Sequence, residues 1–358
     1  MSLSIGIVGL PNVGKSTLFN ALTDSEILAA NYPFATIEPN TGIVPVPDTR
    51  LDVLKKMYSA TKVLPAIVTF VDIAGLVAGA SKGEGLGNKF LASIRQCDAI
   101  THVVRAFEND DIIHVAHRVH PQNDIEIINT ELILADLQTI DTRLPKLAKE
   151  SKADPKKRAS AQYLQGLKEV LETGVPISAM KNVDYEAIAD LHLLTAKPVI
   201  YVFNVDEATL ANDTKKAELT ALAGDSRAIF VCAKLEEELR SLPSEDAAEL
   251  LESYGVNESG LVQLIHAAYD TLGLQSYLTA GPKEIRAWTI KKGATAPEAA
   301  GVIHTDFQRG FIAASIISFN DLVVAGSEQA AKSAGKVATV GKEYLMQPDD
   351  IVEFRFNV

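Results

Sequence analysis

The segment that most constrains the fold runs from Gly9 to Ser16 and reads GLPNVGKS. It matches the pattern of a phosphate-binding loop in full, and it lies between an apolar run at 5–9 and a helix-like run at 16–22. The glycines allow backbone N–H groups to turn toward phosphates at a helix N-terminus. A strand, a tight loop and a helix in this order predict the first unit of an α/β domain.

Four further apolar runs are rich in β-branched or aromatic residues and alternate with helical segments. They lie at residues 66–71, 99–104, 198–203 and 228–232. Near-continuous apolar runs are typical of parallel strands that are covered on both faces of the sheet. The pattern therefore predicts a doubly wound α/β domain across much of residues 1–280.

The composition is that of an ordinary globular chain, with 358 residues, of which 47% are hydrophobic and 22% charged. It excludes disordered, collagen-like and disulfide-stapled chains. No apolar run reaches the ~18 residues that a membrane span needs, so we expect no membrane partner. The first residues enter a strand pattern without the regions of a secretory signal, and the expected location is cytoplasmic.

The strand pattern is interrupted between residues 128 and 195. Leucine and isoleucine recur there at spacings of three and four residues, first from 133 to 147 and again from 164 to 171. This rhythm predicts two antiparallel helices. Pro145 and Pro155 are expected to kink or end these helices.

The connector between the two helices, from Lys146 to Arg158, is locally basic. It carries six Lys or Arg against two Asp or Glu, in a chain with a formal net charge of −12. A basic tip of this kind is a candidate contact for RNA, and a solvated helix connector is an equal alternative. From Gly281 onward, short β-like runs with one helical stretch predict a small α+β domain.

The phosphate loop supplies the candidate nucleotide-binding residues of this sequence. Lys15 is placed to bring positive charge to the β- and γ-phosphates, and we count it among the candidate catalytic residues. The hydroxyl of Ser16 is placed to ligate Mg²⁺. The full set of candidates in the loop is Asn12, Val13, Gly14, Lys15, Ser16 and Thr17.

Two later segments complete the expected magnesium site. Asp72 follows the apolar run at 66–71, so its carboxylate lies where open α/β sheets place ligand groups and contacts Mg²⁺ through water. The Gly75 N–H is expected to meet the γ-phosphate, at the start of a glycine-rich switch loop. Thr36 is the natural first-switch threonine and offers its hydroxyl to Mg²⁺. Asp-x-x-Gly and a Thr in a Pro-flanked loop are each uninformative alone.

Taken together, these stretches resemble the Obg-related P-loop proteins, and closely the YchF, or Obg-like ATPase, branch. The resemblance rests on the loop PNVGKST, the segment NYPFATIEPN at 31–40, the glycine-rich second switch and the helical hairpin. The tail from Arg286 to Ile312 looks like the TGS domain of that branch, which is a β-grasp module. The resemblance covers essentially the whole chain.

The resemblance implies an α/β fold of the P-loop NTPase class, with an Obg-type nucleotide-binding domain, a helical hairpin insertion and a C-terminal TGS domain. The boundaries expected on this basis are 1–127 and 196–280 for the nucleotide-binding domain, 128–195 for the hairpin and 281–358 for the TGS domain.

The choice of base is where this sequence departs from ordinary GTPases. Their Asn-Lys-x-Asp motif uses the Asp carboxylate to accept hydrogen bonds from guanine. Here the corresponding residues are Asn204, Val205 and Glu207, which should spoil that clamp. The resemblance then implies ATP preferred over GTP, and Cys232-Ala233-Lys234 matches the position of the base-contact loop. The alternative is an ordinary turn, with the base held elsewhere.

Water activation is the least specified step. Leu76 stands where Ras-like proteins have the Gln that positions water, so hydrolysis is slow or another group supplies this function. His114 is the candidate, and the resemblance supports a His there; an exposed loop His is the alternative. Asn12 is a candidate ligand for K⁺ beside the phosphates, although an Asn can equally shape the turn.

The function expected from these features is a slow ATP-hydrolysing switch. The resemblance implies the ribosome, or its large subunit, as the partner, with the basic tip and the TGS-like domain as contact surfaces. Two alternatives stay open. One is a guanine-specific Obg-type GTPase in ribosome assembly, and the other is a nucleotide-dependent ribosome- or RNA-binding module with negligible turnover.

Overall fold

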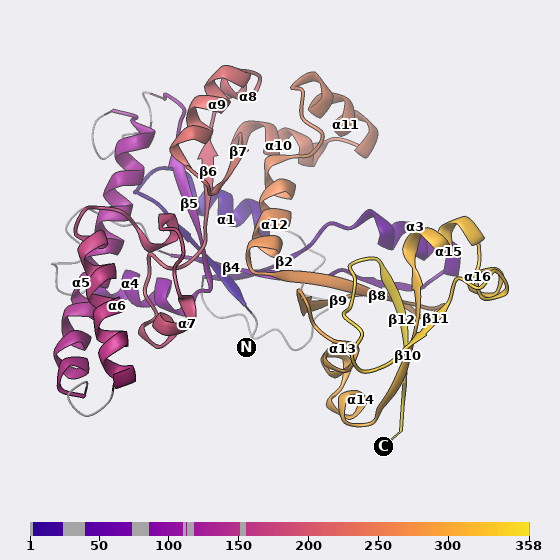
Figure 1. Ribbon diagram of the computed structural model, residues 1–358. Helices are drawn as coiled ribbons and strands as arrows, with labels where there is room; N and C mark the ends of the chain where they lie inside the picture. The colour runs from indigo at the N-terminus through magenta and orange to yellow at the C-terminus, as the bar shows by residue number, and fades with distance from the viewer. Residues whose placement is uncertain are drawn as a thin grey trace. The chain divides into compact units, whose positions relative to one another are not determined.

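The computed structural model describes residues 3–23, 40–73, 86–109, 112, 118–150 and 155–357. The chain divides into two units, whose helices and strands are labelled in Figure 1. Of the described residues, the first unit holds 3–23, 40–42 and those from 69 to 268. The second unit holds 43–68 and those from 269 to 357. Each unit is built on its own sheet.

Within the described residues, the sheet of the first unit has six strands in the order β2-β4-β1-β5-β6-β7. These strands are β1 (Ser4–Val8), β2 (Thr41–Pro45), β4 (Ile67–Asp72), β5 (Ala99–Arg105), β6 (Val199–Asn204) and β7 (Arg227–Val231). β1 pairs in parallel with β4 and β5, and the parallel pairing continues through β6 to β7. Every apolar run that predicts a strand lies in this sheet, which confirms the α/β fold.

Helices connect these strands and pack on the sheet. They are α1 (Lys15–Thr23), α4 (Leu86–Gln96), α5 (Pro121–Glu150), α6 (Pro155–Leu171), α7 (Tyr185–Ile188), α8 (Glu207–Leu210), α9 (Asp213–Leu222), α10 (Ala233–Ser241), α11 (Ser244–Ser253) and α12 (Gly260–Thr271), with 3₁₀ turns at Ile177–Ala179 and Ala189–Leu191. α1 packs on β1, α5 on β5 and α9 on β7. None of the described helices is both long and apolar enough to cross a membrane.

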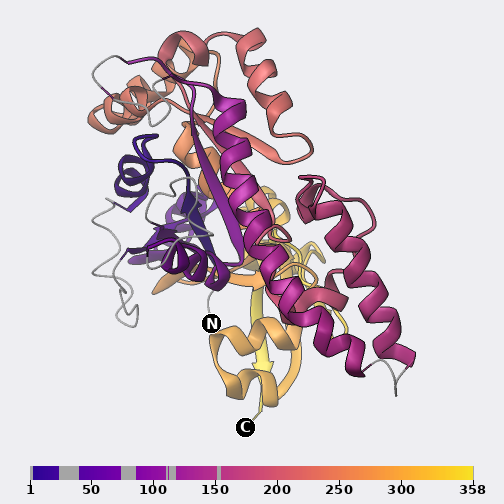
Figure 2. The same cartoon turned by 90° about the vertical axis from the view of Figure 1, so that its left-hand side faces the viewer.

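The predicted hairpin is confirmed as α5 and α6, which lie side by side (Figure 2). The leucines and isoleucines that predict it form one buried cluster, in which Ile140 and Leu171 are almost fully buried. Pro155 begins α6, but the expectation that Pro145 kinks or ends its helix is wrong as to an end, because α5 continues through Pro145 to Glu150. Packing against α6 therefore outweighs the hydrogen bond that a proline removes.

A buried carboxylate fastens the hairpin to the chain that returns from it. Asp136 on α5 accepts hydrogen bonds from the backbone N–H groups of Leu194 (2.7 Å) and Thr195 (2.8 Å), and from the Thr195 hydroxyl (2.7 Å). Burial raises the pKa of this carboxyl, and the hydrogen bonds oppose that shift. Three donors offset the cost of burying the carboxylate, so this contact fixes where the chain enters β6.

The second unit contains, within the described residues, a six-stranded sheet in the order β11-β10-β12-β8-β9-β3. Its elements are α3 (Thr49–Tyr58), β3 (Lys62–Leu64), β8 (Leu274–Ala280), β9 (Glu284–Lys291), α13 (Ala296–Ile303), α14 (Thr305–Arg309), β10 (Phe311–Ser318), α15 (Phe319–Ala325), α16 (Glu328–Ser333), β11 (Ala338–Val340) and β12 (Asp350–Phe356). α13 packs on β9 and β10, and α14 on β10 and β12. The buried side of this unit is rich in alanine and aromatic residues around Tyr277.

This unit includes residues 43–68 and 269–280, which the sequence pattern places in the nucleotide-binding domain. The pairing of strands explains the difference, because β3 pairs with β9 and β8 pairs with β9. Arg50 adds a polar link within the unit, since its guanidinium donates to the Pro348 carbonyl (2.7 Å) and to the Asp349 carboxylate (2.9 Å). Contacts between residues so far apart in sequence leave no local pattern to detect.

Candidate nucleotide-binding site

The loop between β1 and α1 has the backbone that a phosphate-binding loop requires. Gly9 lies so close to β5 that a Cβ atom would fall 2.5 Å from the Val103 carbonyl oxygen. Gly14 has φ +99°, a region that favours glycine. Asn12 also has a positive φ, of 62°, which Asn tolerates better than most residues. Val13 is fully buried, so the loop is anchored in the core while its N–H groups face outward at the start of α1.

Lys15 is the first residue of α1, and its side chain is folded back over the loop. Only 7% of the residue is exposed, and its ammonium donates to the Leu10 carbonyl at 2.6 Å. Burial lowers the pKa of Lys15 to about 8, and the negative charge of Asp72 opposes this shift. A cation held in this position, with little water around it, is well placed to bind phosphate oxygens strongly.

Ser16 and Asp72 come together as the sequence predicts. The Ser16 hydroxyl donates to the Asp72 carboxylate at 3.4 Å, and Asp72 is the last residue of β4. Mg²⁺ prefers oxygen ligands and keeps several waters, so a hydroxyl and a carboxylate beside bound phosphates fit it. In the described part of the chain, no group of three His, Cys, Asp or Glu residues could hold a metal. The donors therefore suit a cation that arrives with the nucleotide.

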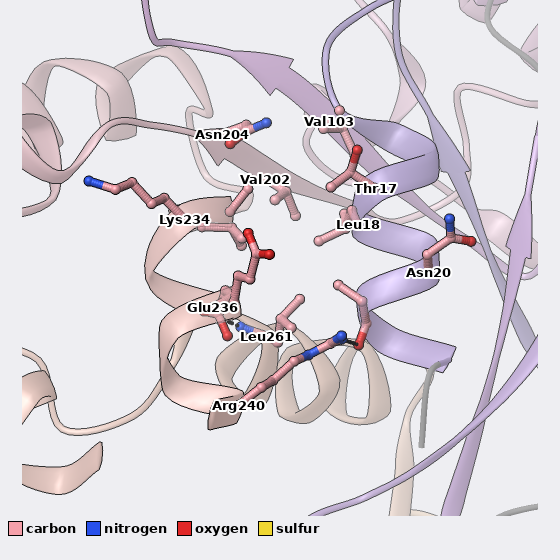
Figure 3. Close-up of a pocket in the computed structure, with 15 residues that line it drawn as sticks. Thr17, Leu18, Asn20, Val103, Val202, Asn204, Lys234, Glu236, Arg240 and Leu261 are labelled. Carbon is pink, nitrogen blue, oxygen red and sulfur yellow. Dashed lines mark hydrogen bonds between the residues drawn. The ribbon is translucent and has the colours of Figure 1, made fainter. Parts of the chain in front are cut away.

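A pocket of about 500 Å³ lies beside this loop, between α1 and α10. Figure 3 shows Thr17 and Asn204 at one end of it and Arg240 at the other. Asn204 ends β6, and its side-chain amide donates to the Val13 carbonyl at 3.1 Å. One side chain thus connects the predicted base motif to the phosphate loop, and a nucleotide can contact both at once.

Glu207 lies opposite Lys234, which the sequence places in the base-contact loop. The Lys234 ammonium contacts both oxygens of the Glu207 carboxylate, at 2.9 and 3.1 Å, and the hydrogen bond raises the pKa of Lys234. Lys234 also lines the pocket. The side chain of Val205, in contrast, is packed in the core around Phe203, and its N–H donates to the Val231 carbonyl at 2.9 Å.

The structure thus brings seven of the candidate residues around one loop and one pocket: Asn12, Val13, Gly14, Lys15, Ser16, Thr17 and Asp72. Asn204 joins them through its hydrogen bond to the loop. Thr36, Gly75 and His114 lie outside the described residues.

Two pocket residues are not anticipated by any motif. The Glu236 carboxylate is buried and accepts a hydrogen bond from the Leu261 N–H at 3.2 Å, and burial raises its pKa. Arg240 donates to the Ala21 carbonyl near the end of α1 (Figure 3). Both lie four residues apart on α10, a spacing that is also typical of an exposed helix face.

Nucleotide affinity is expected to depend on pH through Lys15. Because its pKa in the free protein is about 8 and bound phosphates raise it, affinity should be constant below pH 8 and fall above it. The fall can approach tenfold per pH unit, at about the limit for one proton. Fluorescence titrations with an ATP analogue between about pH 7 and 9.5 would measure it. A constant affinity throughout, or the same decline in Lys15→Met, would contradict this role.

Comparison with known proteins agrees with this site. A family model described as "50S ribosome-binding GTPase" matches residues 4–135, and the YchF-GTPase C-terminal model, described as a protein of unknown function, matches 274–357. The "Ribosome-binding ATPase YchF" of Haemophilus ducreyi is 51% identical over 363 residues, and that of Bacillus subtilis is 50% identical over 366. In both cases the alignment covers 100% of each chain.

A solved structure with similar topology is titled "Structure of the Schizosaccharomyces pombe YchF GTPase". It is 39% identical, covers 99% of this chain and 98% of its own, and superposes with a TM-score of 0.87. Full-length relatives at half identity leave no part of the fold unaccounted for, and the chain belongs to the YchF family.

Proposed function

We propose that the chain binds Mg²⁺·ATP and hydrolyses it slowly, as a switch that associates with the ribosome. The observation that carries the proposal is the hydrogen bond of Asn204 to Val13, which joins a base pocket to a phosphate loop that already holds Lys15, Ser16 and Asp72 together. The printed names of the relatives support both ATP hydrolysis and ribosome binding. A cytoplasmic location is part of the same proposal.

The roles of the residues follow from their chemistry. Lys15 binds the β- and γ-phosphate oxygens, and the N–H groups of the loop bind those that face the start of α1. Ser16 and Asp72 would hold Mg²⁺, which when bound neutralises charge on the phosphates; Thr36 and Gly75 are the proposed switch contacts. In hydrolysis a water oxygen bonds to the γ-phosphorus, the bond to the bridging oxygen breaks, and ADP and a proton leave. His114 is the proposed residue that positions this water.

The preference for ATP rests on the contact between Glu207 and Lys234. A guanine clamp needs a carboxylate whose two oxygens both accept from guanine, but here both oxygens contact the Lys234 ammonium. Adenine lacks those two donors and therefore loses nothing when this carboxylate is engaged. The remaining polar contact, the side-chain amide of Asn204, can serve either purine. Val205 contributes by leaving no lysine beside the base.

Removing Lys234 is expected to weaken this selectivity. In Lys234→Met the Glu207 carboxylate is free to accept from guanine, so GTP affinity should rise by about two- to fivefold, the range of an exposed ion pair, while ATP affinity stays within about twofold. Competition titrations against a labelled nucleotide would measure both. An unchanged ratio of the two affinities would show that this ion pair does not set the choice of base.

The guanine-specific alternative is favoured by the printed descriptions that use the word GTPase for one matching family model and for the fission yeast structure. A binding module with negligible turnover is the other alternative. Phosphate release from ATP and from GTP, measured with and without ribosomes, separates all three. The proposal predicts release from ATP that Asp72→Ala abolishes, and co-sedimentation with ribosomes that depends on the nucleotide.

Release from GTP alone would support the GTPase, and nucleotide-dependent co-sedimentation without release over hours would support the binding module. Separated ribosomal subunits in the same experiment test the large subunit as the partner. Substitution of the basic residues between Lys146 and Arg158, and deletion of the TGS-like domain, test the two proposed contact surfaces. Replacing K⁺ by Na⁺ tests Asn12 as a cation ligand, because a K⁺ site beside the phosphates predicts slower release in Na⁺.

A further inference from the structure

A fully buried arginine at the end of β5 takes no part in the site described above. Arg105 is the last residue of that strand, and only 1% of it is exposed. Arginine is almost never buried to this extent unless its N–H groups find acceptors. Its acceptors therefore indicate what the side chain does.

The guanidinium donates to three backbone carbonyls of the loop that follows β5. Its Nε contacts the Phe107 carbonyl at 3.1 Å, one Nη contacts that of Asn109 at 3.0 Å, and the other contacts that of Ile112 at 2.9 Å. The guanidinium also lies over the Phe107 ring, 4.6 Å from its centre. A planar fork with this many fixed donors holds the loop more firmly than one hydrogen bond could.

The loop is held in the same frame as the nucleotide site. Arg105 lies opposite Asn204 in the pairing of β5 with β6, and the Ala106 N–H donates to the Asn204 carbonyl at 2.8 Å. The side chain of the same Asn204 donates to Val13 in the phosphate loop. Two short steps of hydrogen bonds therefore connect the loop after β5 to the phosphate loop.

We propose that Arg105 is a positioning residue for nucleotide hydrolysis, which fixes the loop after β5 for the residue that orients water. It acts through His114, which follows Ile112 by two residues in the sequence, and the inference rests on the proposed role of that histidine. Arg105 touches neither nucleotide nor water in this account. Its loss therefore lowers kcat and leaves the KM for ATP almost unchanged, because the phosphate loop and base pocket keep their own contacts.

The test measures ATP hydrolysis by the full chain in single and double variants. Arg105→Lys keeps the charge but loses the fork, and kcat should fall at least about tenfold with KM within about threefold. In the His114→Ala background, Arg105→Lys should change kcat by less than about twofold, because the residue through which it acts is already absent. Arg95→Lys is the matched control, since the Arg95 guanidinium donates to the Thr139 hydroxyl (2.9 Å) and the His192 carbonyl (3.3 Å), away from this loop. It should leave kcat unchanged.

A second variant covers the case in which Arg105→Lys fails to fold. Phe107→Leu keeps every carbonyl acceptor and removes only the ring beneath the guanidinium, at a half-buried position. A fall in kcat of about two- to fivefold at constant KM, which is absent in the His114→Ala background, supports the inference.

Three results would overturn it. Equal loss of kcat from Arg105→Lys with and without His114 would show that Arg105 acts independently of that histidine. A rise in KM with kcat intact would place Arg105 in binding. Full activity of His114→Ala would remove the proposed catalytic role of His114 itself, and the inference with it, so this failure is distinguishable from the other two.

Discussion

Replacement of Lys15 by Met is expected to lower the affinity for Mg²⁺·ATP by at least about 100-fold. The ammonium is the one charged group of the phosphate loop itself, and each hydrogen bond to a charged group contributes about 1.5–3 kcal/mol. Two such contacts to phosphate oxygens amount to at least about 3 kcal/mol, which is more than 100-fold in affinity. Isothermal titration of the nucleotide-free protein would measure the change.

The fold should survive this substitution. Met fills most of the volume of the Lys15 stem, and the nucleotide-free protein no longer buries a cation, so its melting temperature should stay the same or rise. Lys234→Met is the matched control, because it removes a cation that is 74% exposed at the other side of the pocket. Its ATP affinity should stay within about twofold of the wild type. Comparable losses in both variants would contradict the role given to Lys15.

Replacement of Gly14 by Ala is the second change with a large expected effect. Gly14 has φ +99°, and a Cβ atom there would collide with the side-chain nitrogen of Asn204. The variant must therefore strain the loop and displace the amide that holds Val13, at a cost of about 1–3 kcal/mol in the free energy of unfolding. Nucleotide affinity should fall by at least about 30-fold, because the N–H groups of the loop lose their aim.

Gly166→Ala is the control for this change. Gly166 lies in α6, a Cβ atom there would meet nothing within 4 Å, and helix propensity favours Ala by about 1 kcal/mol. The control should therefore bind ATP normally and unfold at the same or a higher denaturant concentration. If Gly14→Ala bound ATP as tightly as this control, the close approach of Gly14 and Asn204 would have no functional weight.

Local patterns made the first unit predictable. The sequence from β1 through the phosphate loop to α1 contains its own glycines and its own periodicity, so both the fold and the roles of Lys15 and Ser16 follow from a few residues. Asp72 is predictable for the same reason, because a polar residue directly after a buried strand lies at the ligand edge of a parallel sheet. The helical hairpin is equally local, since its two helices pack mainly on each other.

Contacts between distant segments were not predictable in this way. No pattern in residues 43–68 reveals that β3 pairs with β9, and Pro145 appears to favour a helix end that long-range packing overrides. The three hydrogen bonds of Arg105 form with carbonyl groups, which carry no signal in the sequence. The sequence does align Lys234 with a base-contact loop, but only the folded chain brings its ammonium to Glu207.

Measurement of wild-type affinity for ATP and for GTP, in the presence of Mg²⁺, tests the central claim most directly. Glu207→Asp should accompany it, because the shorter carboxylate can withdraw from Lys234, whereas Val205 is buried and a lysine there would disturb the core. The account predicts that the wild type binds ATP at least about fivefold more tightly than GTP and that the variant narrows this ratio. Tighter binding of GTP by the wild type would contradict it.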